Sequence, residues 1–107
     1  MVVNQRSGFR ANFGVVNVSP VPVEVLVEIF TADGEPAPGD SSFTVNLEAF
    51  DTTQVNDILK RLPAGQRDGL IIRAGVTSGE GAILSYLTNV DNTTNDSTYQ
   101  AGFRFAF

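Results

Sequence analysis

The chain has 107 residues with no cysteine and no histidine, and twelve acidic residues against seven basic ones give it a net charge of −5. This length fits one domain, residues 1–107, with enough core to fold without disulfides or a structural metal. The acidic balance and the scattered basic residues argue against nucleic-acid binding, which needs clustered Lys and Arg side chains.

Two segments near the N-terminus have the alternating pattern of β-strands. Residues 9–15 carry an apolar side chain at every second position, but the alternation slips after Gly14. The slip predicts a β-bulge near residues 14–16, where one strand gains an extra residue. Residues 21–30 alternate β-branched residues with other types. The two prolines at their start place them at a sheet edge or at the beginning of a strand.

The middle of the chain contains a third strand and then a change of period. After a loop with the Asp33-Gly34 turn signal, residues 43–49 alternate again, as expected for a strand. Four apolar residues then follow helical spacing: Val55, Ile58, Leu59 and Leu62. This spacing predicts a short α-helix near residues 53–62, with one of residues 51–53 as its N-cap. We expect this helix to cover one open end of the sheet stack.

The last third of the chain contains three more alternating segments, residues 70–76, 82–90 and 99–107. The glycine-rich turn at residues 78–81 predicts a hairpin between the first two of them. Six strands, or seven if Val2-Val3 also pairs, and one short helix indicate an all-β fold. We therefore predict an antiparallel Ig-like β-sandwich.

Residues able to support catalysis are scarce. Without His or Cys, the chain lacks the usual general base, the thiol nucleophile and the soft metal ligands. The single lysine, Lys60, is expected on an exposed face, and Glu24, Glu28 and Glu48 are expected on the solvent side of strands. No glycine stands ahead of a helix in phosphate-binding spacing. We therefore expect no enzyme activity, no catalytic residues and no cofactor.

The polar loop of residues 91–97 is the densest group of side-chain oxygens. Asp91, Asn92, Asn95 and Asp96 are calcium candidates, because calcium prefers carboxylate, amide and carbonyl oxygens. Their spacing is not that of an EF-hand, and the alternative is turn chemistry, in which Asn and Asp bond their own backbone. Glycosylation sequons also begin at Asn17, Asn92 and Asn95.

Aromatic residues supply two further alternatives. Phe30 and Phe50 fall on expected outer faces at the ends of strands, where they would stack against sugars or fold over the edge of the core. The terminal segment, residues 103–107, is an aromatic strand. It would complete its own sheet or add to the edge of a neighbouring molecule.

Two segments together resemble a known type of module. Residues 9–19, Phe-Arg-Ala-Asn-Phe-Gly-Val-Val-Asn-Val-Ser, resemble the "Arg-Thr-Asn-Leu-Gly-Leu-Val-Asn" opening of an Ig-like β-sandwich accessory module of bacterial secreted and cell-surface proteins. Residues 86–99 resemble the "Tyr-Ala-Ser-Val-Val-Asp-Asn-x-Thr-Gly-Asp-Pro-Thr" closing of that module. The resemblance covers roughly residues 8–99, with Asn95 and Ser97 where the family usually has glycine and proline.

The resemblance implies an extracellular or cell-surface location and a non-catalytic role as a spacer, adhesion or binding domain, with a protein or polysaccharide partner. It implies no catalytic residues. The alternative is a subunit that assembles into a fibre or surface layer by edge-strand addition, and a second alternative is calcium-dependent binding. No apolar run approaches the ~20 residues of a membrane helix, so we expect no membrane insertion. The first residues also lack the features of a signal peptide.

Overall fold

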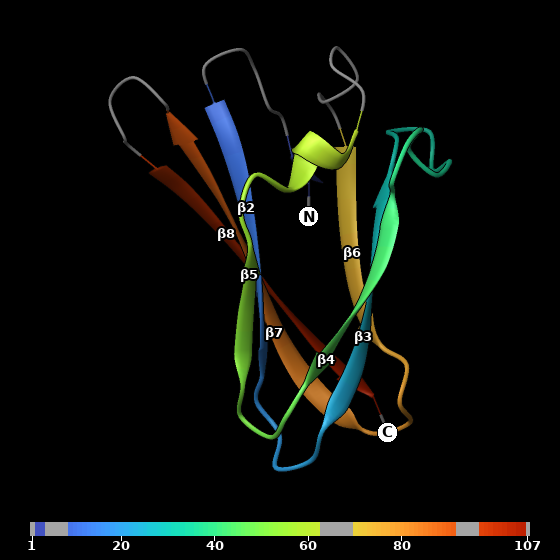
Figure 1. The fold of residues 1–107 in the computed structure, drawn as a ribbon, viewed down its shortest axis with the longest axis vertical. Coiled ribbons are helices and arrows are strands. Elements are labelled where there is room, and N and C mark those ends of the chain that lie inside the picture. Colours follow the sequence, from blue (N-terminus) through green and yellow to red (C-terminus); the bar gives the residue numbers. More distant parts are fainter. Residues whose placement is uncertain (1, 4–8, 63–69, 92–96, 107) are drawn as a thin grey trace.

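The structure, a computed structural model, describes residues 2–3, 9–62, 70–91 and 97–106. These residues form two four-stranded antiparallel sheets that pack face to face (Figure 1). The strands are β1 (Val2–Val3), β2 (Phe9–Asn17), β3 (Val23–Phe30), β4 (Ser42–Leu47), β5 (Thr52–Val55), β6 (Leu70–Val76), β7 (Gly81–Asp91) and β8 (Ser97–Ala106). The predicted all-β sandwich is confirmed.

The two sheets have the strand orders β1-β6-β3-β4 and β5-β2-β7-β8. The neighbours β2 and β5, and β3 and β6, correspond to the central B–E and C–F pairs of an Ig sandwich. The outer strands differ from a constant-type Ig domain, because β1 pairs with β6, β4 with β3 and β7 with β2. The topology therefore matches an Ig sandwich in its two central pairs and departs from it in the strands around them.

The predicted hairpin at residues 78–81 is wrong. This turn connects β6 of one sheet to β7 of the other. Packed sheets lie ~10 Å apart, and a few extended residues at about 3.3 Å each span that distance. Gly79 and Gly81, with φ of 100° and 131°, turn the chain at this crossing. A short glycine-rich turn thus fits a sheet-to-sheet connection as well as a hairpin.

The predicted β-bulge near residues 14–16 is also wrong. The pairing of β2 with β7 runs without interruption from Phe9 opposite Asp91 to Asn17 opposite Ile83. The apparent slip arises because the inward position after Val15 is occupied by Asn17, a buried polar residue. The alternation itself continues, with Val16 and Val18 on the outward positions.

The α-helix predicted near residues 53–62 is wrong in type and in extent. Thr52–Val55 forms β5, which pairs with β2, and only Ile58–Arg61 (η1) is helical, as a 3-10 turn. The β-branched residues of β5 favour a strand where an edge of β2 is available for pairing. Asp57, just before η1, has φ of 50° and makes no side-chain cap.

The expected covering role of this segment is confirmed. Ile58 and Leu59 of η1 are fully buried, and Leu62 after it is buried at 3% exposure. In Figure 1 the turn lies across the upper end of the space between the sheets. The helical spacing therefore identified the correct buried residues but not the backbone that presents them.

The core lies between the inner faces of the two sheets. Its largest strand residues are Phe13, Ile29, Ile72, Ile83 and Leu87. Ile83 and Leu87 lie on the inner face of β7. The outer face therefore carries Ala82, Leu84, Tyr86 and Thr88, which are half-buried. The Cα pairing of β7 with β8 extends from Gly81–Ala106 to Val90–Ser97. The C-terminal strand therefore completes its own sheet.

Tyr86 occupies a notch on the outer face of β7. A Cβ on Gly14 of β2 would lie 2.0 Å from the Tyr86 ring, so only glycine leaves room for this ring across β2. The Tyr86 hydroxyl donates a 2.7 Å hydrogen bond to Oε1 of Gln54 in β5. Tyr86 thus connects three neighbouring strands.

Among the described residues, no helix has the length and apolar character needed to cross a membrane.

Candidate interaction surface

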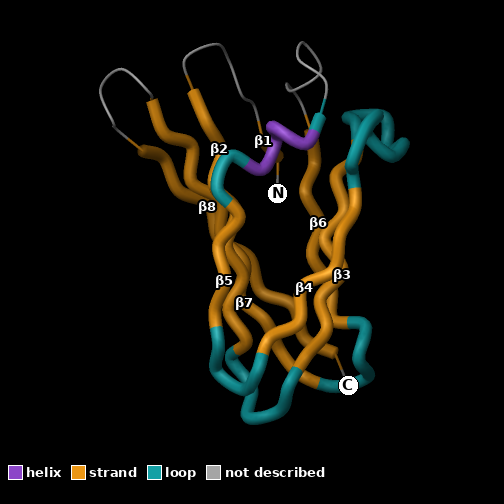
Figure 2. The backbone as a smooth tube through the Cα atoms, in the orientation of Figure 1, coloured by secondary structure: helices purple, strands orange, loops and turns teal. Residues whose placement is uncertain are grey.

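Three connections meet at one end of the sandwich. They are the β2–β3 connection (residues 18–22), the β4–β5 connection (residues 48–51) and the β6–β7 connection (residues 77–80), drawn together at the lower end of Figure 2. Backbone hydrogen bonds join the β2–β3 connection to the β4–β5 connection, from Phe50 N to Ser19 O (3.2 Å), and to the start of β7, from Val18 N to Ala82 O (3.0 Å).

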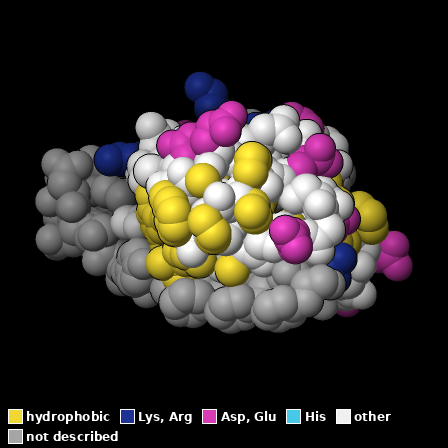
Figure 3. All heavy atoms as spheres, turned by 90° about the horizontal axis from the view of Figure 1, so that it is seen from below, with side chains coloured by type: hydrophobic (Ala, Val, Ile, Leu, Met, Phe, Trp, Pro, Cys, Tyr) yellow, Lys and Arg dark blue, Asp and Glu magenta, His cyan; other side chains and the backbone are white. Residues whose placement is uncertain are grey.

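Apolar side chains gather on this end of the molecule. We call this set the loop-end surface: Val18, Pro20, Val21, Pro22, Ala49 and Phe50. Val21 is half-buried and the other five residues are exposed. Val18 and Phe50 are the exposed large hydrophobic residues of the described chain, at 40% and 66%. Figure 3, which views this end, shows an apolar area with acidic side chains at its margins.

The buried side chain of Asn17 holds the loop-end surface in place. Its Nδ2 donates to the carbonyl oxygens of Val21 (2.7 Å) and Glu48 (2.9 Å). Its Oδ1 accepts hydrogen bonds from the backbone N–H (3.0 Å) and the hydroxyl of Ser19. Both donors and both acceptor positions of the amide are therefore used. Asn17, at 0% exposure, fixes the β2–β3 and β4–β5 connections relative to each other.

Phe50 has a backbone conformation that disfavours its side chain. Residues 48–51 form a tight turn closed by a 3.1 Å hydrogen bond from Asp51 N to Glu48 O. Phe50, the third residue, has φ of 59°, and type II turns place Gly or Asn at this position. A non-glycine residue in this region costs roughly 1–2 kcal/mol. The fold therefore holds an aromatic residue at the tip of this turn at a cost in stability.

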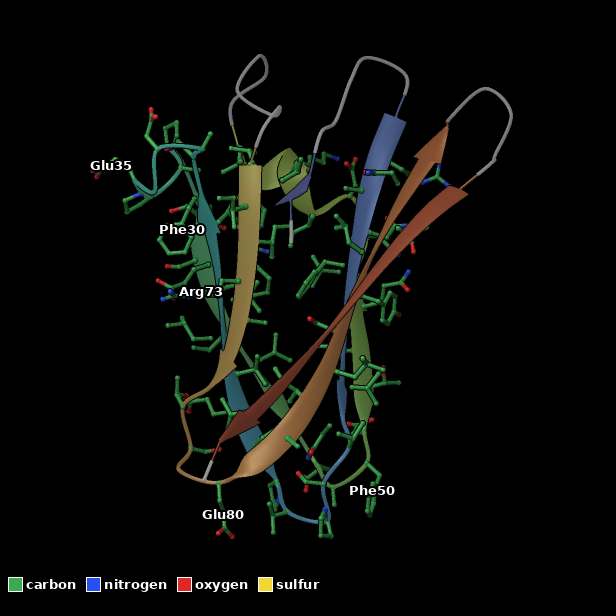
Figure 4. All side chains as sticks on the ribbon, turned by 180° about the vertical axis from the view of Figure 1, so that it is seen from behind. Phe30, Glu35, Phe50, Arg73 and Glu80 are labelled. Atoms are coloured by element: carbon green, nitrogen blue, oxygen red, sulfur yellow. The ribbon has the colours of Figure 1, made fainter. Side chains whose placement is uncertain are left out.

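The orientation of Phe50 rules out the core-capping role. Its side chain points away from the sandwich, at the same end as Glu80 (Figure 4). Phe30, by contrast, is half-buried, with the Arg73 guanidinium 5.3 Å from its ring centroid. Strained residues that the surrounding structure holds in place cluster at binding and active sites. The combination of strain and exposure therefore makes Phe50 the central residue of a candidate interaction site.

The charged residues within the three connections are all acidic, and the Lys and Arg side chains in Figure 3 lie at the edges of this face. Glu48, Asp51 and Glu80 are exposed within the three connections, and Glu24 is exposed at the start of β3. No Lys or Arg occurs anywhere from residue 11 to residue 59. The ion pairs between described residues lie elsewhere, joining Arg61 to Asp40 and Arg73 to Glu28.

An open groove of about 240 Å³ borders the loop-end surface. Its lining residues are Pro22, Val23, Glu24, Asn46, Leu47, Glu48 and Ser78. Small-molecule and cofactor sites usually measure ~300–1,000 Å³, so this groove has the size for a side chain. Pro22 and Glu48 belong both to the groove and to the connections that carry the apolar residues. The groove and the loop-end surface are therefore continuous.

A second shallow groove, of about 290 Å³, lies on the outer face of β3 and β6. It contains the 3.2 Å ion pair between Arg73 and Glu28, and Gly75 leaves open space beside it. Its charges neutralise each other within the sheet face. This groove therefore lacks the unpaired charge and exposed aromatic residue of the loop end.

The structure brings only part of the predicted calcium loop into view. Asp91 is the last residue of β7, opposite Phe9 in β2, whereas Asn92, Asn95 and Asp96 lie outside the described residues. Among the residues that are described, no three His, Cys, Asp or Glu side chains are grouped as metal ligands. Calcium binding by this loop stays a prediction.

The sequons have different structural settings. The Asn17 amide is fully buried and donates both of its hydrogens within the fold, so the folded chain offers no free amide there. Asn92 and Asn95 lie outside the described residues. The Asn17-Val-Ser-Pro sequence therefore has a structural role instead of serving as a glycosylation site. Its buried amide fixes the turn that follows β2.

Sequence reasoning missed the structural role of Asn17 and left two roles open for Phe50. A polar residue at the inward position of a strand, followed by Ser-Pro, was the available signal for Asn17. The Glu-Ala-Phe-Asp turn gave no comparable signal, because positive φ is expected at glycine or asparagine.

Comparisons with protein-family models, curated proteins and solved structures give no match. The resemblance to bacterial accessory modules accordingly stays a prediction.

Proposed function

We propose that this chain is a non-catalytic β-sandwich module that binds another macromolecule through the loop-end surface. The observation that carries the proposal is Phe50, which is 66% exposed with φ of 59°. Neither property stabilises the isolated fold. Both become favourable when a partner covers the ring, because buried aromatic residues at the centre of an interface dominate binding energy.

The energy available from Phe50 is large for a single residue. A buried aromatic side chain covers about 150–250 Å², so the exposed two-thirds of Phe50 offers about 130 Å². At about 25 cal/mol per Å², covering this area contributes about 3 kcal/mol. That amount corresponds to roughly a hundredfold in affinity. The fixed backbone around Asn17 also means that little loop ordering is required on binding.

The cellular setting follows from the resemblance in sequence. The likeness of residues 9–19 and 86–99 to accessory modules of bacterial secreted and cell-surface proteins supports an extracellular adhesion or binding role. The absence of His and Cys from the chain supports a role without catalysis, and a module of this kind needs no cofactor.

A displayed library of random peptides tests the proposed function. Peptides selected on the wild-type protein are then measured against Phe50→Ser and against the matched control Phe30→Ser, an aromatic residue on the outer face of β3. We expect most selected peptides to lose about tenfold or more in affinity for Phe50→Ser and to keep their affinity for Phe30→Ser. Circular dichroism establishes that both variants are folded. Peptides that bind Phe50→Ser as tightly as wild type contradict the proposal.

The second candidate function is a subunit of an extracellular fibre or surface layer. The observation that favours it is the position of β8, a long strand at the edge of its sheet, which leaves one side of its backbone for strand addition. Light scattering over a wide concentration range, with negative-stain microscopy, separates the two functions. Monodisperse monomers at every concentration contradict the fibre subunit and are expected for the binding module.

A further inference from the structure

We propose that the partner of the loop-end surface is a basic amphipathic protein segment, which places an apolar side chain on Phe50 and a Lys or Arg in the adjacent groove. This inference rests on the proposed function and specifies the chemistry of the partner. It comes from the arrangement of charge around the apolar residues and from the shape of the groove.

Acidic residues stand before and after Phe50 in the sequence, and a third lies at the same end of the molecule. Glu48 and Asp51 belong to the turn that carries Phe50, and Glu80 lies at the same end of the molecule (Figure 4). A partner that covers Phe50 removes water from these neighbouring groups. Burying a carboxylate without a compensating charge is costly. For an apolar partner without basic residues, this cost offsets much of the binding free energy gained by covering the Phe50 ring.

The groove has the features of a site for a long basic side chain. Pro22 is the exposed apolar residue of its lining, since Val23 and Leu47 are only 3% exposed. Pro22 offers a contact for the methylene stem of Lys or Arg, whose charged head stays near the rim. The groove volume of about 240 Å³ equals that of about eight liquid water molecules. This space accommodates one side chain.

One of the two acidic groups of the groove, the Glu24 carboxylate, is oriented by a hydrogen bond. The Glu24 carboxylate accepts a 3.1 Å hydrogen bond from the Thr77 hydroxyl, and its backbone N–H donates to Ser78 Oγ (3.1 Å). Glu48 lines the groove as well, with its backbone oxygen bonded to Asn17. Neither glutamate pairs with a basic side chain among the described residues. A preoriented acceptor costs less entropy on binding than a free one.

The charge balance disfavours the other occupants of an apolar surface. A second copy of this chain would bring the same acidic end against itself, and the whole chain carries a net charge of −5. Like-charge contacts cost several kcal/mol at an interface. The same repulsion acts against anionic lipid surfaces and anionic polysaccharides. A basic protein segment satisfies both the apolar and the acidic parts of the surface.

An array of short synthetic peptides tests the inference. The peptides share one apolar content and carry lysines, glutamines or glutamates at the remaining positions. They are measured against wild type, against the double variant Glu24→Gln/Glu48→Gln, and against Asp33→Asn/Glu35→Gln. The last variant is a matched control because it removes the same charge at the opposite end of the sandwich, where Figure 4 labels Glu35. We expect lysine peptides to bind wild type and the control alike, and to bind the groove variant about tenfold more weakly.

The outcomes separate this inference from the proposed function. Equal binding of lysine and glutamate peptides, or equal losses in the groove variant and the control, would overturn the basic partner. If those peptides still depended on Phe50, the loop-end surface would remain a binding site for a partner of other chemistry. Loss of Phe50 dependence for every peptide would instead remove the proposed function itself.

Discussion

Replacing Asn17 with alanine should destabilise the protein by about 4 kcal/mol. The Asn17 side chain makes four hydrogen bonds, two to carbonyl oxygens and two from Ser19. Each contributes about 1 kcal/mol net, and the residue is completely buried, so water does not replace them without opening the fold. The loss is a large part of the 5–15 kcal/mol that holds a typical domain together.

Urea unfolding followed by far-UV circular dichroism measures this effect, because the chain has no tryptophan for fluorescence. At roughly 4 °C per kcal/mol for a domain of this size, the melting temperature should fall by about 15 °C. Asn12→Ala is the matched control. Asn12 is half-buried and accepts one hydrogen bond, from Asp57 N (2.9 Å), so its loss should cost about 1 kcal/mol.

Asn17→Asp separates the two halves of the network. Aspartate keeps the acceptor for Ser19 but places a carboxylate oxygen opposite the carbonyls of Val21 and Glu48. At neutral pH this variant should be at least as unstable as Asn17→Ala, because a buried charge then faces two acceptors. If Asn17→Ala costs no more than Asn12→Ala, the amide does not organise the loop end and this reasoning is refuted.

Three further predictions concern other parts of the chain. Gly14→Ala should cost about 1–3 kcal/mol by overpacking against Tyr86, and an equal cost in a Tyr86→Ser background, measured by urea unfolding, would show that the ring is not the obstacle. Arg61→Ala should cost about 1 kcal/mol, because the guanidinium lies 4.0 Å from the Phe43 ring centroid; an unchanged melting curve would show that the stacking contributes nothing. Calcium at one hundred times its dissociation constant should add about 2.7 kcal/mol if residues 91–96 bind it, whereas an unchanged melting temperature in millimolar calcium excludes a tight site there.

Much of the sandwich could be predicted because alternation reports directly on which residues face the core. Val25, Val27 and Ile29 of β3 and Leu70 and Ile72 of β6 are buried as the period of two requires. The pattern does not report which strands pair. The connection from β6 to β7 was therefore misread, since an alternating strand looks the same in either sheet.

The wrong predictions over residues 53–62 and 14–16 have related causes. The spacing of Val55, Ile58, Leu59 and Leu62 is helical, yet the first of these residues lies in a strand that pairs with Phe13. Tertiary pairing overrides a short local period because β5 gains a ladder with β2 that an isolated helical turn cannot match. The wrong prediction of a β-bulge near residues 14–16 has a similar origin. The polar residue Asn17 interrupted the apolar alternation of the sequence without interrupting the strand.

The candidate site was harder to predict than the fold. The polar residues of the 91–97 loop attract attention because their side chains carry recognisable ligand atoms. The loop-end surface depends instead on the backbone conformation of Phe50 and on three connections that are distant in sequence. Neither property can be read from residue type. The sequence indicates only the acidic character of this end, because it contains no Lys or Arg between residues 11 and 59.

Nuclear magnetic resonance titration of the labelled protein with a lysine-bearing amphipathic peptide tests the central claim most directly. If the loop-end surface and its groove bind the peptide, the largest amide shifts should fall on residues 17–24 and 46–52, with smaller changes around residues 77–80. The shifts should disappear with Phe50→Ser while the spectrum of that variant keeps the dispersion of a folded sandwich. Shifts that centre on the β3–β6 outer face or on η1, or that persist unchanged in Phe50→Ser, would contradict the account.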